Sequence, residues 1–408
     1  MKPRMLFVSP EFPWPATSGG RLRTLSLLRC LGTRFEIHCV TFTEKDSTPP
    51  DAGGLRSSVA RLTVVPLTPH RQTTLSRYAR NMRRALQFAH PFVDRYSEPE
   101  ARRAVCRLVN QEREWIWFEH VWVAPYVTGR GQGATTILDV HNVESAFYRQ
   151  LRRTTRNPLE RVGFRVFQQA ARKIERQFVP CFDRVLAVSE EERQLLARDG
   201  VAGKIFVVPN AVQPVSLQPD SGGDHRTLYF AGRLDYPPNR QAILWFCKRV
   251  WPLIQSRVPN ARCQVLGVCP ERLGVELRRS PNMIVAGQVE TIEPFVAQSS
   301  VAIVPVLSGG GTRFKVLDAW AAGKAVVSTT TGAEGLAARH GENIWLADEP
   351  QEFADSVVRL LKDPELRAVL GRNGRKTVEE RYSLERLQES LDAALLGARG
   401  APAEQGCA

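Results

Sequence analysis

The chain has 408 residues, of which 43% are hydrophobic and 24% charged, and its formal net charge is +14. This length exceeds what one hydrophobic core usually serves, and the composition excludes fibrous and wholly disordered proteins. No apolar run reaches the roughly 18 residues that span a bilayer, and Pro10, Glu11 and Pro13 interrupt the N-terminal segment too early for a signal peptide. We therefore expect a cytoplasmic protein with two domains.

The positive charge is concentrated in the first half of the chain. Residues 1–224 contain 33 lysines and arginines against 22 acidic residues. Such a surplus favours an anionic partner, such as an anionic membrane surface or an anionic acceptor. The basic segments lack interleaved aromatic residues and known reading motifs, so we expect no nucleic-acid partner. The eight cysteines form no C-x-x-C pair, so we expect buried thiols and no metal site.

Short β-branched runs alternate with helical patterns along the whole chain. They are RMLFVSP, FEIHCVTF, RLTVVPL, TTILDVH, RVLAVS and IFVVPN, then TLYFAGR, RCQVLGV, NMIVAGQV, VAIVPVL, AVVSTT and NIWLAD. Near-continuous apolar strands of this kind are typical of parallel sheets covered by helices on both faces. The sequence therefore predicts an α/β protein with two doubly wound, Rossmann-like units.

The break between the units is expected in residues 213–226, where Pro, Ser, Gly and Asp cluster without periodicity. We assign an N-terminal domain to residues 1–215 and a C-terminal domain to residues 216–382. Residues 383–396 form a last helical pattern that fits on either domain. The tail, residues 397–408, has the composition of a disordered segment.

The first candidate ligand loop follows the strand RMLFVSP. Gly19 and Gly20 stand immediately before an apolar, periodic helix. The free amides and the positive end of a helix favour an anion, and glycines let a phosphate approach the backbone closely. A tight turn explains the same two glycines.

A basic amphipathic helix is expected within residues 71–90. Leu75, Tyr78, Met82, Leu86 and Ala89 share one helical stripe, and the segment contains no acidic residue. Four arginines lie near this stripe: Arg77, Arg80, Arg83 and Arg84. This pattern is typical of a helix lying on an anionic membrane surface. A helix packed on the core with a solvated basic face has the same pattern.

A candidate catalytic histidine, His141, directly follows the strand TTILDV. Open α/β sheets bind ligands at the carboxyl ends of their strands, where a histidine can donate to a sugar hydroxyl or position reacting groups. A purely structural histidine remains open, and His120 competes for the same place.

Two loops of the second half carry candidate anion ligands. Arg233 ends the strand TLYFAG, where a guanidinium can bind a diphosphate, although a surface ion pair is the alternative. The other loop follows VAIVPVL, and its small residues Ser308 to Gly311 open a helix. This segment offers backbone amides, cations and a carboxylate that suits a ribose diol: Gly310, Gly311, Thr312, Arg313, Lys315 and Asp318.

Over nearly its whole length the chain resembles the retaining glycosyltransferases of family 4, which have the GT-B fold. The resemblance is carried by the following motifs in this order: SGGRLRTLSLLRCL, DVHNVES, LAVSEEE, IFVVPNAV, FAGRL and GGGTRFKVLDAWAAGKAVVSTTTGAEGL. It implies two facing Rossmann-like domains with an interdomain cleft, a nucleoside-diphosphate sugar held mainly by the second domain, and no cofactor or obligatory metal.

The resemblance also implies roles for single residues. Gly20 lies near the transferred sugar and the diphosphate, and His141 lies beside the sugar. Arg233 binds the diphosphate, and Asp318 holds the ribose.

Two departures from the family pattern affect the donor site. Gly310 stands where the family has a first glutamate, and Glu334 is the candidate substitute. Pro238 and Asn239 stand where relatives place a lysine, so Lys315 or Arg313 is expected to supply the second cation, with Arg240 as a weaker candidate.

The function expected from these residues is retaining transfer of a sugar from a nucleoside-diphosphate sugar, such as a UDP-sugar. The acceptor is a glycan, a lipid-linked molecule or another glycoconjugate, in bacterial surface polysaccharide synthesis. His141, Arg233 and Lys315 are the candidate catalytic residues, and the enzyme acts in the cytoplasm or peripherally on the inner face of the plasma membrane. The alternatives are a nucleotide-sugar epimerase of GT-B fold and a non-catalytic sugar-nucleotide binder.

Overall fold

The computed structural model describes residues 2–45, 53–69, 73–111, 114–129, 133–155, 157–197, 201–213, 226–311 and 313–396. Contacts divide the chain into two compact units. The first contains Met1–Pro209 and the chain from Leu387 onward, and the second contains Asn210–Arg386. The division falls at residue 209, whereas the sequence boundary was set at residue 215. The predicted tail, residues 397–408, lies outside the described residues.

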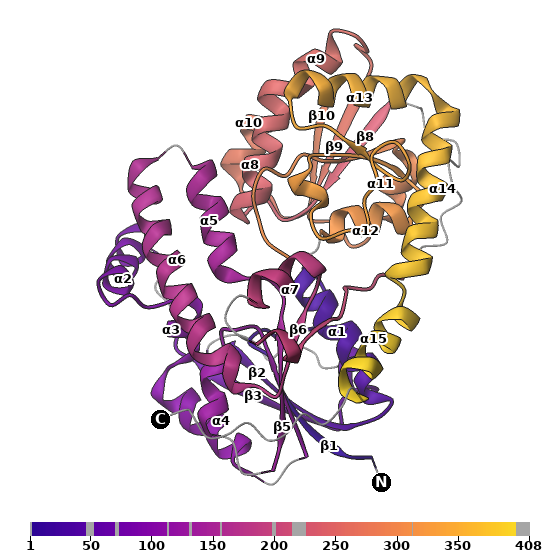
Figure 1. Ribbon diagram of the computed structural model, residues 1–408. Helices are drawn as coiled ribbons and strands as arrows, with labels where there is room; N and C mark the ends of the chain where they lie inside the picture. The colour runs from indigo at the N-terminus through magenta and orange to yellow at the C-terminus, as the bar shows by residue number, and fades with distance from the viewer. Residues whose placement is uncertain are drawn as a thin grey trace. The chain divides into compact units, whose positions relative to one another are not determined.

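The first unit is built on a sheet that, in its described part, has seven parallel strands in the order β3-β2-β1-β4-β5-β6-β7 (Figure 1). The strands are β1 (Arg4–Val8), β2 (Glu36–Glu44), β3 (Arg61–Leu67), β4 (Trp115–Glu119), β5 (Thr135–Val140), β6 (Arg184–Ala187) and β7 (Ile205–Val207). Four consecutive residues of β1 and of β4 are fully buried. Continuous burial explains why these strands have no alternating polar pattern.

The helices of the first unit connect successive strands or extend their loops. They are α1 (Gly19–Gly32), α2 (Thr74–Leu86), α3 (Pro91–Tyr96), α4 (Pro99–Val109), α5 (Glu144–Thr154), α6 (Pro158–Phe178) and α7 (Glu190–Ala197). The last helix, α15 (Leu384–Leu396), joins this unit from residue 387 onward. There Arg184 donates to the carbonyl of Ala394, and Arg34 forms an ion pair with Asp392. The C-terminal helix therefore belongs with the N-terminal unit.

The second unit repeats the plan with a parallel sheet of six described strands in the order β10-β9-β8-β11-β12-β13. The strands are β8 (Thr227–Ala231), β9 (Arg262–Leu266), β10 (Met283–Gly287), β11 (Val301–Val304), β12 (Ala325–Ser328) and β13 (Trp345–Leu346). The helices are α8 (Pro237–Trp245), α9 (Trp251–Gln255), α10 (Glu271–Arg278), α11 (Glu293–Gln298), α12 (Phe314–Ala321), α13 (Pro350–Lys362) and α14 (Pro364–Arg381).

The order of strands decides where ligands can bind in each unit. In the first, β1 lies between β2 and β4, and β5 follows β4, so the carboxyl ends of β1, β4 and β5 are neighbours. In the second, β8 lies between β9 and β11. These are the points at which the strand order reverses, where doubly wound sheets bind their ligands. The fold class predicted from the sequence is therefore confirmed for each unit.

Candidate active site

The first unit gathers charged side chains at the carboxyl ends of β4 and β5. Asp139 is fully buried and accepts from the Nε and Nη2 atoms of Arg23, at 2.8 and 2.5 Å. The Nε2 atom of His141 lies 3.0 Å from Asp139 Oδ2 and 3.5 Å from Glu119 Oε1. The other carboxylate oxygen of Glu119 accepts from the hydroxyl of Thr24 at 2.7 Å. Two acids and two bases thus form one buried network.

The network fixes the charge of each member. Burial acts to raise the pKa of Asp139, but the pairing with Arg23 outweighs it and holds this pKa well below its usual range. Burial acts to lower the pKa of His141, but the hydrogen bonds to Asp139 and Glu119 outweigh it and raise the pKa to about 9. His141 is therefore an imidazolium at neutral pH.

The neighbouring histidine, His120, is driven the other way. Burial, and then the charge of His141, lower its pKa well below the ordinary value. Its ring lies 3.7 Å from that of His141 and stacks on Trp122 at 4.2 Å, measured between centroids. Its backbone has φ of +61°, an uncommon conformation for a residue with a side chain. The pair thus consists of a cationic ring, His141, and a neutral ring, His120.

The free end of His141 faces the start of α1. Its Nδ1 atom is buried and has no hydrogen-bond partner among the described residues. A Cβ placed on Gly20 would lie 3.7 Å from this atom, at ordinary contact distance. Amides of the first helical turn have no partner within the helix. An oxygen-rich ligand placed here would accept from the imidazolium and from these amides of Gly19 and Gly20.

The same three acidic and imidazole groups could in principle hold a metal ion. Ligand atoms of Glu119, Asp139 and His141 lie within 4.8 Å of one another. However, both oxygens of Asp139 already accept from Arg23, and a cation would lie next to that guanidinium. This donor set fits an ion-pair network better than a metal centre.

The second unit presents Arg233 directly after β8. Its guanidinium forms a two-bond ion pair with Asp235, at 3.1 and 2.6 Å, and the two side chains are 45% and 39% exposed. The backbone carbonyl of Arg233 accepts from the amide of the buried Asn239. An incoming diphosphate would compete with Asp235 for this cation.

Lys315, on α12, packs against the loop that carries Arg233. A Cβ on Gly232 would lie 2.7 Å from Lys315 Cε and 3.1 Å from its Nζ, so the end of this side chain lies directly against the β8 loop. The Lys315 ammonium lies 5.9 Å from the ring centroid of Phe230. Burial and the charge of Arg313 lower the pKa of Lys315 to about 8. The structure thus brings a second cation to the β8 loop, where Pro238 and Asn239 cannot supply one.

Asp318 lies one turn further along α12. Burial raises its pKa to about 7, and the charge of Lys315 only partly opposes this shift. The carboxyl group is therefore close to half protonated at neutral pH. A carboxyl group that is protonated about half of the time can both accept from and donate to a diol.

Arg313 is directed at its own loop. Its guanidinium donates to the carbonyls of Gly309 and Gly310, both at 2.8 Å, and its Nε donates to that of Thr331 at 3.1 Å. Gly309 and Gly311 have φ of +139° and +73°, which favour glycine. The side chain therefore holds the glycine loop in shape, and Lys315 is the cation that reaches the β8 loop.

The structure does not test the roles of the remaining predicted site residues. Glu334 is largely exposed, and its carboxylate lies 3.5 Å from the Arg313 guanidinium. Thr312 lies outside the described residues, as does the side chain of Arg77. Gly310 lies in the loop that Arg313 holds. The predicted roles of these residues stay predictions.

The network around His141 was not predicted from the sequence. Three charged residues lie within or at the end of mostly apolar runs. The residues are Arg23, Glu119 and Asp139, and the runs are LRTLSLL, WIWFE and TTILDV. A lone charged residue in such a run indicates a buried partner. These lone charges therefore indicate buried ion pairs, but the sequence does not show which charged residue pairs with which.

Comparison with known proteins gives the family. A model described as "Glycosyl transferase 4-like domain" matches residues 18–211, and one described as "Glycosyl transferases group 1" matches residues 225–363. A Klebsiella pneumoniae protein, "Uncharacterized 44.6 kDa protein in cps region", is 21% identical over 401 residues, which are 95% of this chain and 98% of that protein.

Solved glycosyltransferase structures share the fold. HepE of Anabaena, solved with UDP-glucose, is 14% identical, with a TM-score of 0.68 over 97% of this chain and 100% of that one. TarM of S. aureus, solved with Fondaparinux, alpha-GlcNAc-glycerol and UDP, is 10% identical, with a TM-score of 0.70 over 97% and 99%. The two family models together cover most of the chain, and both units have the Rossmann-like sheet. The chain belongs to the group 1 glycosyltransferases, with the GT-B fold, and is an enzyme that transfers sugars.

Proposed function

We propose that the enzyme transfers a sugar from a UDP-sugar to a glycan or lipid-linked acceptor with retention of anomeric configuration, in surface polysaccharide synthesis. The observation that carries this proposal is the packing of Lys315 against Gly232, which puts a second cation beside the Arg233 loop. Two cations and the amides of a glycine loop suit a diphosphate. HepE and TarM were solved with UDP-glucose and UDP, and the Klebsiella relative belongs to a cps region.

In the proposed complex the second unit holds the nucleotide. Arg233 exchanges Asp235 for the diphosphate, and Lys315 approaches it from α12. Asp318 accepts from the ribose hydroxyls. The glycine loop, held by Arg313, offers its amides to the distal phosphate.

The proposed reaction breaks the bond between the anomeric carbon and the distal phosphate oxygen, and forms a bond from the acceptor oxygen on the same face. The acceptor proton passes to an oxygen of the departing phosphate, so atoms and charge balance. Arg233, Lys315 and the loop amides stabilise the charge that develops on UDP. We expect no cofactor and no obligatory metal, because these groups supply the positive charge.

Gly20 and His141 are proposed to face the transferred sugar. The cationic His141 donates from Nδ1 to a sugar or phosphate oxygen. Glu334 is the proposed replacement for the carboxylate that Gly310 lacks. Replacement of Glu334 by Gln should then raise KM for the donor without changing the melting temperature.

A lipid-linked acceptor would place the reaction at the inner face of the plasma membrane, with the enzyme peripheral to it. Within the described residues, no helix is long and apolar enough to cross a bilayer. The attachment that we propose uses a surface of the folded protein.

The first test is a thermal-shift screen of nucleoside-diphosphate sugars, followed by NMR of the anomeric configuration of the product. A cognate UDP-sugar at about 100 times its dissociation constant should add about 2.7 kcal/mol to the unfolding free energy. Absence of stabilisation by every UDP-sugar would overturn the donor, and an inverted product would overturn retention. Donor turnover without transfer to any acceptor would favour an epimerase or hydrolase, and stabilisation without turnover a binder.

The matched mutational test compares two arginines of the second unit. Arg233→Ala should lower kcat/KM by about 100-fold or more, as loss of a charge-stabilising donor does elsewhere. Arg257→Ala removes an exposed arginine paired with Asp355 and should leave transfer unchanged. Near-normal transfer by Arg233→Ala would remove this residue from the mechanism.

A further inference from the structure

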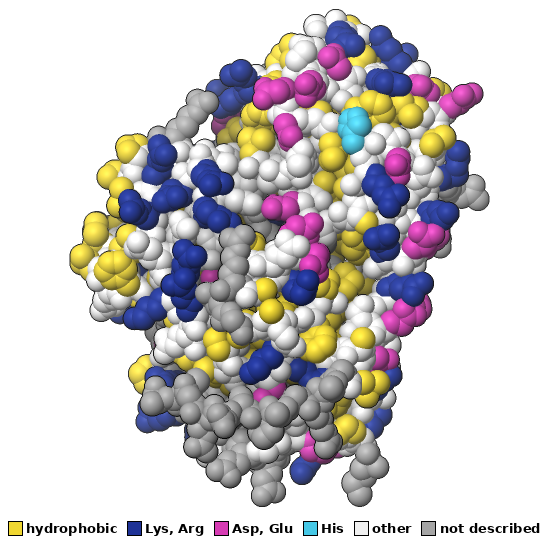
Figure 2. Space-filling model, viewed as in Figure 1, with side chains coloured by type: hydrophobic (Ala, Val, Ile, Leu, Met, Phe, Trp, Pro, Cys, Tyr) yellow, Lys and Arg dark blue, Asp and Glu magenta, His cyan; other side chains and the backbone are white. Residues whose placement is uncertain are grey.

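The helix α2 carries its apolar stripe on the outside of the molecule. Four side chains of the stripe are exposed by between 63% and 81%: Leu75, Tyr78, Met82 and Leu86. Phe88, just past the helix end, is 55% exposed and has φ of +48°, which is rare for a bulky residue. Figure 2 shows hydrophobic side chains gathered over α2, at the left edge of the view. This exposure contradicts the alternative that the stripe packs on the core.

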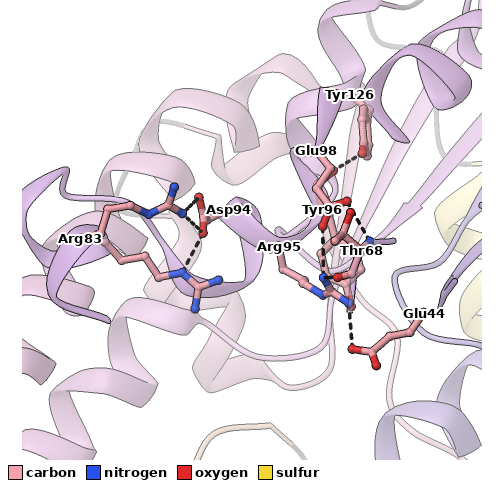
Figure 3. Close-up of polar contacts among 9 residues, drawn as sticks. Glu44, Thr68, Arg83, Asp94, Arg95, Tyr96, Glu98 and Tyr126 are labelled. Carbon is pink, nitrogen blue, oxygen red and sulfur yellow. Dashed lines mark hydrogen bonds and ion pairs between the residues drawn. The ribbon is translucent and has the colours of Figure 1, made fainter. Parts of the chain in front are cut away.

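The polar side of α2 is the side that is fastened to the protein. Arg84 is 6% exposed and donates to Asp94 Oδ2 at 2.7 Å, while Arg83 donates to both oxygens of Asp94 at 3.1 and 3.0 Å. Figure 3 shows the carboxylate of Asp94, on α3, facing Arg83. Arg84, which the sequence placed near a membrane-facing stripe, therefore lies on the protein side of α2, whereas Leu75 and Leu86 face outward.

The helix α3 is in turn tied to the sheet. Arg95 donates to Glu98 at 3.1 Å, to Glu44 at the end of β2 at 3.0 Å, and to the carbonyl of Thr68 at 2.5 Å (Figure 3). The Tyr126 hydroxyl donates to the carbonyl of Tyr96. These bonds fix α3, and through Asp94 they fix the orientation of α2. The outward direction of the stripe is thus imposed by the fold.

Arginines of the neighbouring helices make this surface basic. α6 contacts α2 and packs along α5. Arg152, Arg153, Arg161 and Arg165 line a hollow of about 370 Å³ together with Val162. Val162 and the adjacent Leu159 are 64% and 83% exposed. Figure 2 shows Lys and Arg gathered over α5 and α6. Apolar side chains and arginines therefore alternate over one part of the first unit.

We propose that α2 and the arginine hollow of α5 and α6 form the surface by which the enzyme docks on an anionic lipid bilayer. The apolar stripe enters the boundary between headgroups and acyl chains, and the arginines bind lipid phosphates. Stable attachment to a membrane without a spanning helix needs two such signals, and the surface supplies both. A bilayer fits better than a second copy of this chain, because the facing arginines of two copies would repel each other.

This proposal deepens the membrane location in the proposed function but needs no donor or acceptor. The test is co-sedimentation of the full chain with vesicles of phosphatidylcholine, with and without phosphatidylglycerol. The stripe variant is Leu75→Ser with Leu86→Ser. Its matched control is Val275→Ser with Val369→Ser, which changes two exposed apolar residues of the second unit. A charge variant, Arg152→Gln with Arg153→Gln, tests the hollow.

We expect the wild-type chain and the control to bind vesicles that contain phosphatidylglycerol, and to bind more weakly as salt is added. The stripe variant should bind at least tenfold more weakly, and the charge variant should lose most of the dependence on salt and on phosphatidylglycerol. All variants should keep the wild-type melting temperature and the thermal shift with a UDP-sugar, so a failed donor assignment would not be mistaken for failed docking.

Three results would overturn the proposal. Equal binding by the stripe variant and the control would remove α2 from the contact. Equal binding to neutral and anionic vesicles would show that the arginines do not contribute to the contact with the membrane. A wild-type dimer that the stripe variant converts to monomer, without vesicle binding, would assign the surface to a second copy of the chain.

Discussion

Replacement of Asp139 by Asn should destabilise the first unit strongly. The change keeps the size of the side chain and removes its charge. Asp139 is fully buried and Arg23 is 2% exposed, and the carboxylate also pairs with His141. Loss of the charge leaves a guanidinium and an imidazolium with only Glu119 to balance them. Breaking a buried pair in this way costs about 3–5 kcal/mol.

Calorimetry of the purified variant measures this cost. For a unit of roughly 200 residues, each kcal/mol shifts the melting temperature by about 2–4 °C, so we expect a fall of roughly 6–20 °C. Asp392→Asn is the matched control, because Asp392 is paired with Arg34 at the surface of the same unit. That change should cost about 1 kcal/mol or less. Equal melting temperatures for the two variants would refute the buried network.

The dependence on pH gives a second measure of the same network. The folded pKa of His141, about 9, lies above its ordinary value of about 6.5, so its contribution is present in full below the ordinary value and is lost as the pH rises through 9. At about 1.4 kcal/mol for each pKa unit, the contribution is about 3 kcal/mol. The wild-type chain should lose this stability between those pH values, and Asp139→Asn should show a flatter curve. A flat wild-type curve would contradict a cationic His141.

Two further predictions concern the donor site. In the free enzyme the pKa of Lys315 is lowered to about 8 and that of Asp318 is raised to about 7, so kcat/KM should fall above the first value and below the second. Lys315→Met should abolish the fall of kcat/KM at alkaline pH. A pH profile unchanged by this variant would contradict the role of Lys315 in binding the diphosphate. Gly20→Ala should not destabilise the fold, because Gly20 is the second residue of α1 and its Cβ meets only ordinary contacts near His141. Transfer should nevertheless fall, since the Cβ takes space proposed for the sugar. Gly163→Ala, in open space in the interior of α6, should stabilise the protein by about 0.5–1 kcal/mol without loss of transfer, and full activity in both variants would contradict a ligand at Gly20.

All the described strands except β4 (Trp115–Glu119) were predicted from the sequence, because burial on both faces leaves a local signal. The runs MLFV and VLA are apolar throughout, and they lie in β1 and β6. The carboxyl ends of β5, β8 and β11 then locate His141, Arg233 and the glycine loop, in that order. Short segments are enough to predict where the strands lie and which loops follow them, so a single sequence is sufficient for these two predictions.

The direction of individual side chains was not predictable in this way. The sequence places Arg313 in the glycine loop, but only the folded backbone decides that its guanidinium reaches three carbonyls. The stripe of α2 is evident from its spacing, whereas its outward orientation depends on Asp94, ten residues from Arg84 in another helix. Arg23 and Asp139 are 116 residues apart. Each of these contacts depends on how the backbone folds, whether its partners are close in sequence or far apart, and residue spacing alone does not predict it.

The charge of His141 limits the chemistry that it can perform in the proposed reaction. A ring with a pKa of about 9 is already protonated at neutral pH, so it cannot accept the acceptor proton as a general base. The proposed base is instead the departing phosphate oxygen, which agrees with a reaction on one face of the sugar. The fixed cation instead donates from Nδ1 toward developing negative charge, where a preorganised donor is most effective. Asp139 and Glu119 are therefore positioning residues: they keep the imidazole charged and leave its Nδ1 atom directed at Gly20.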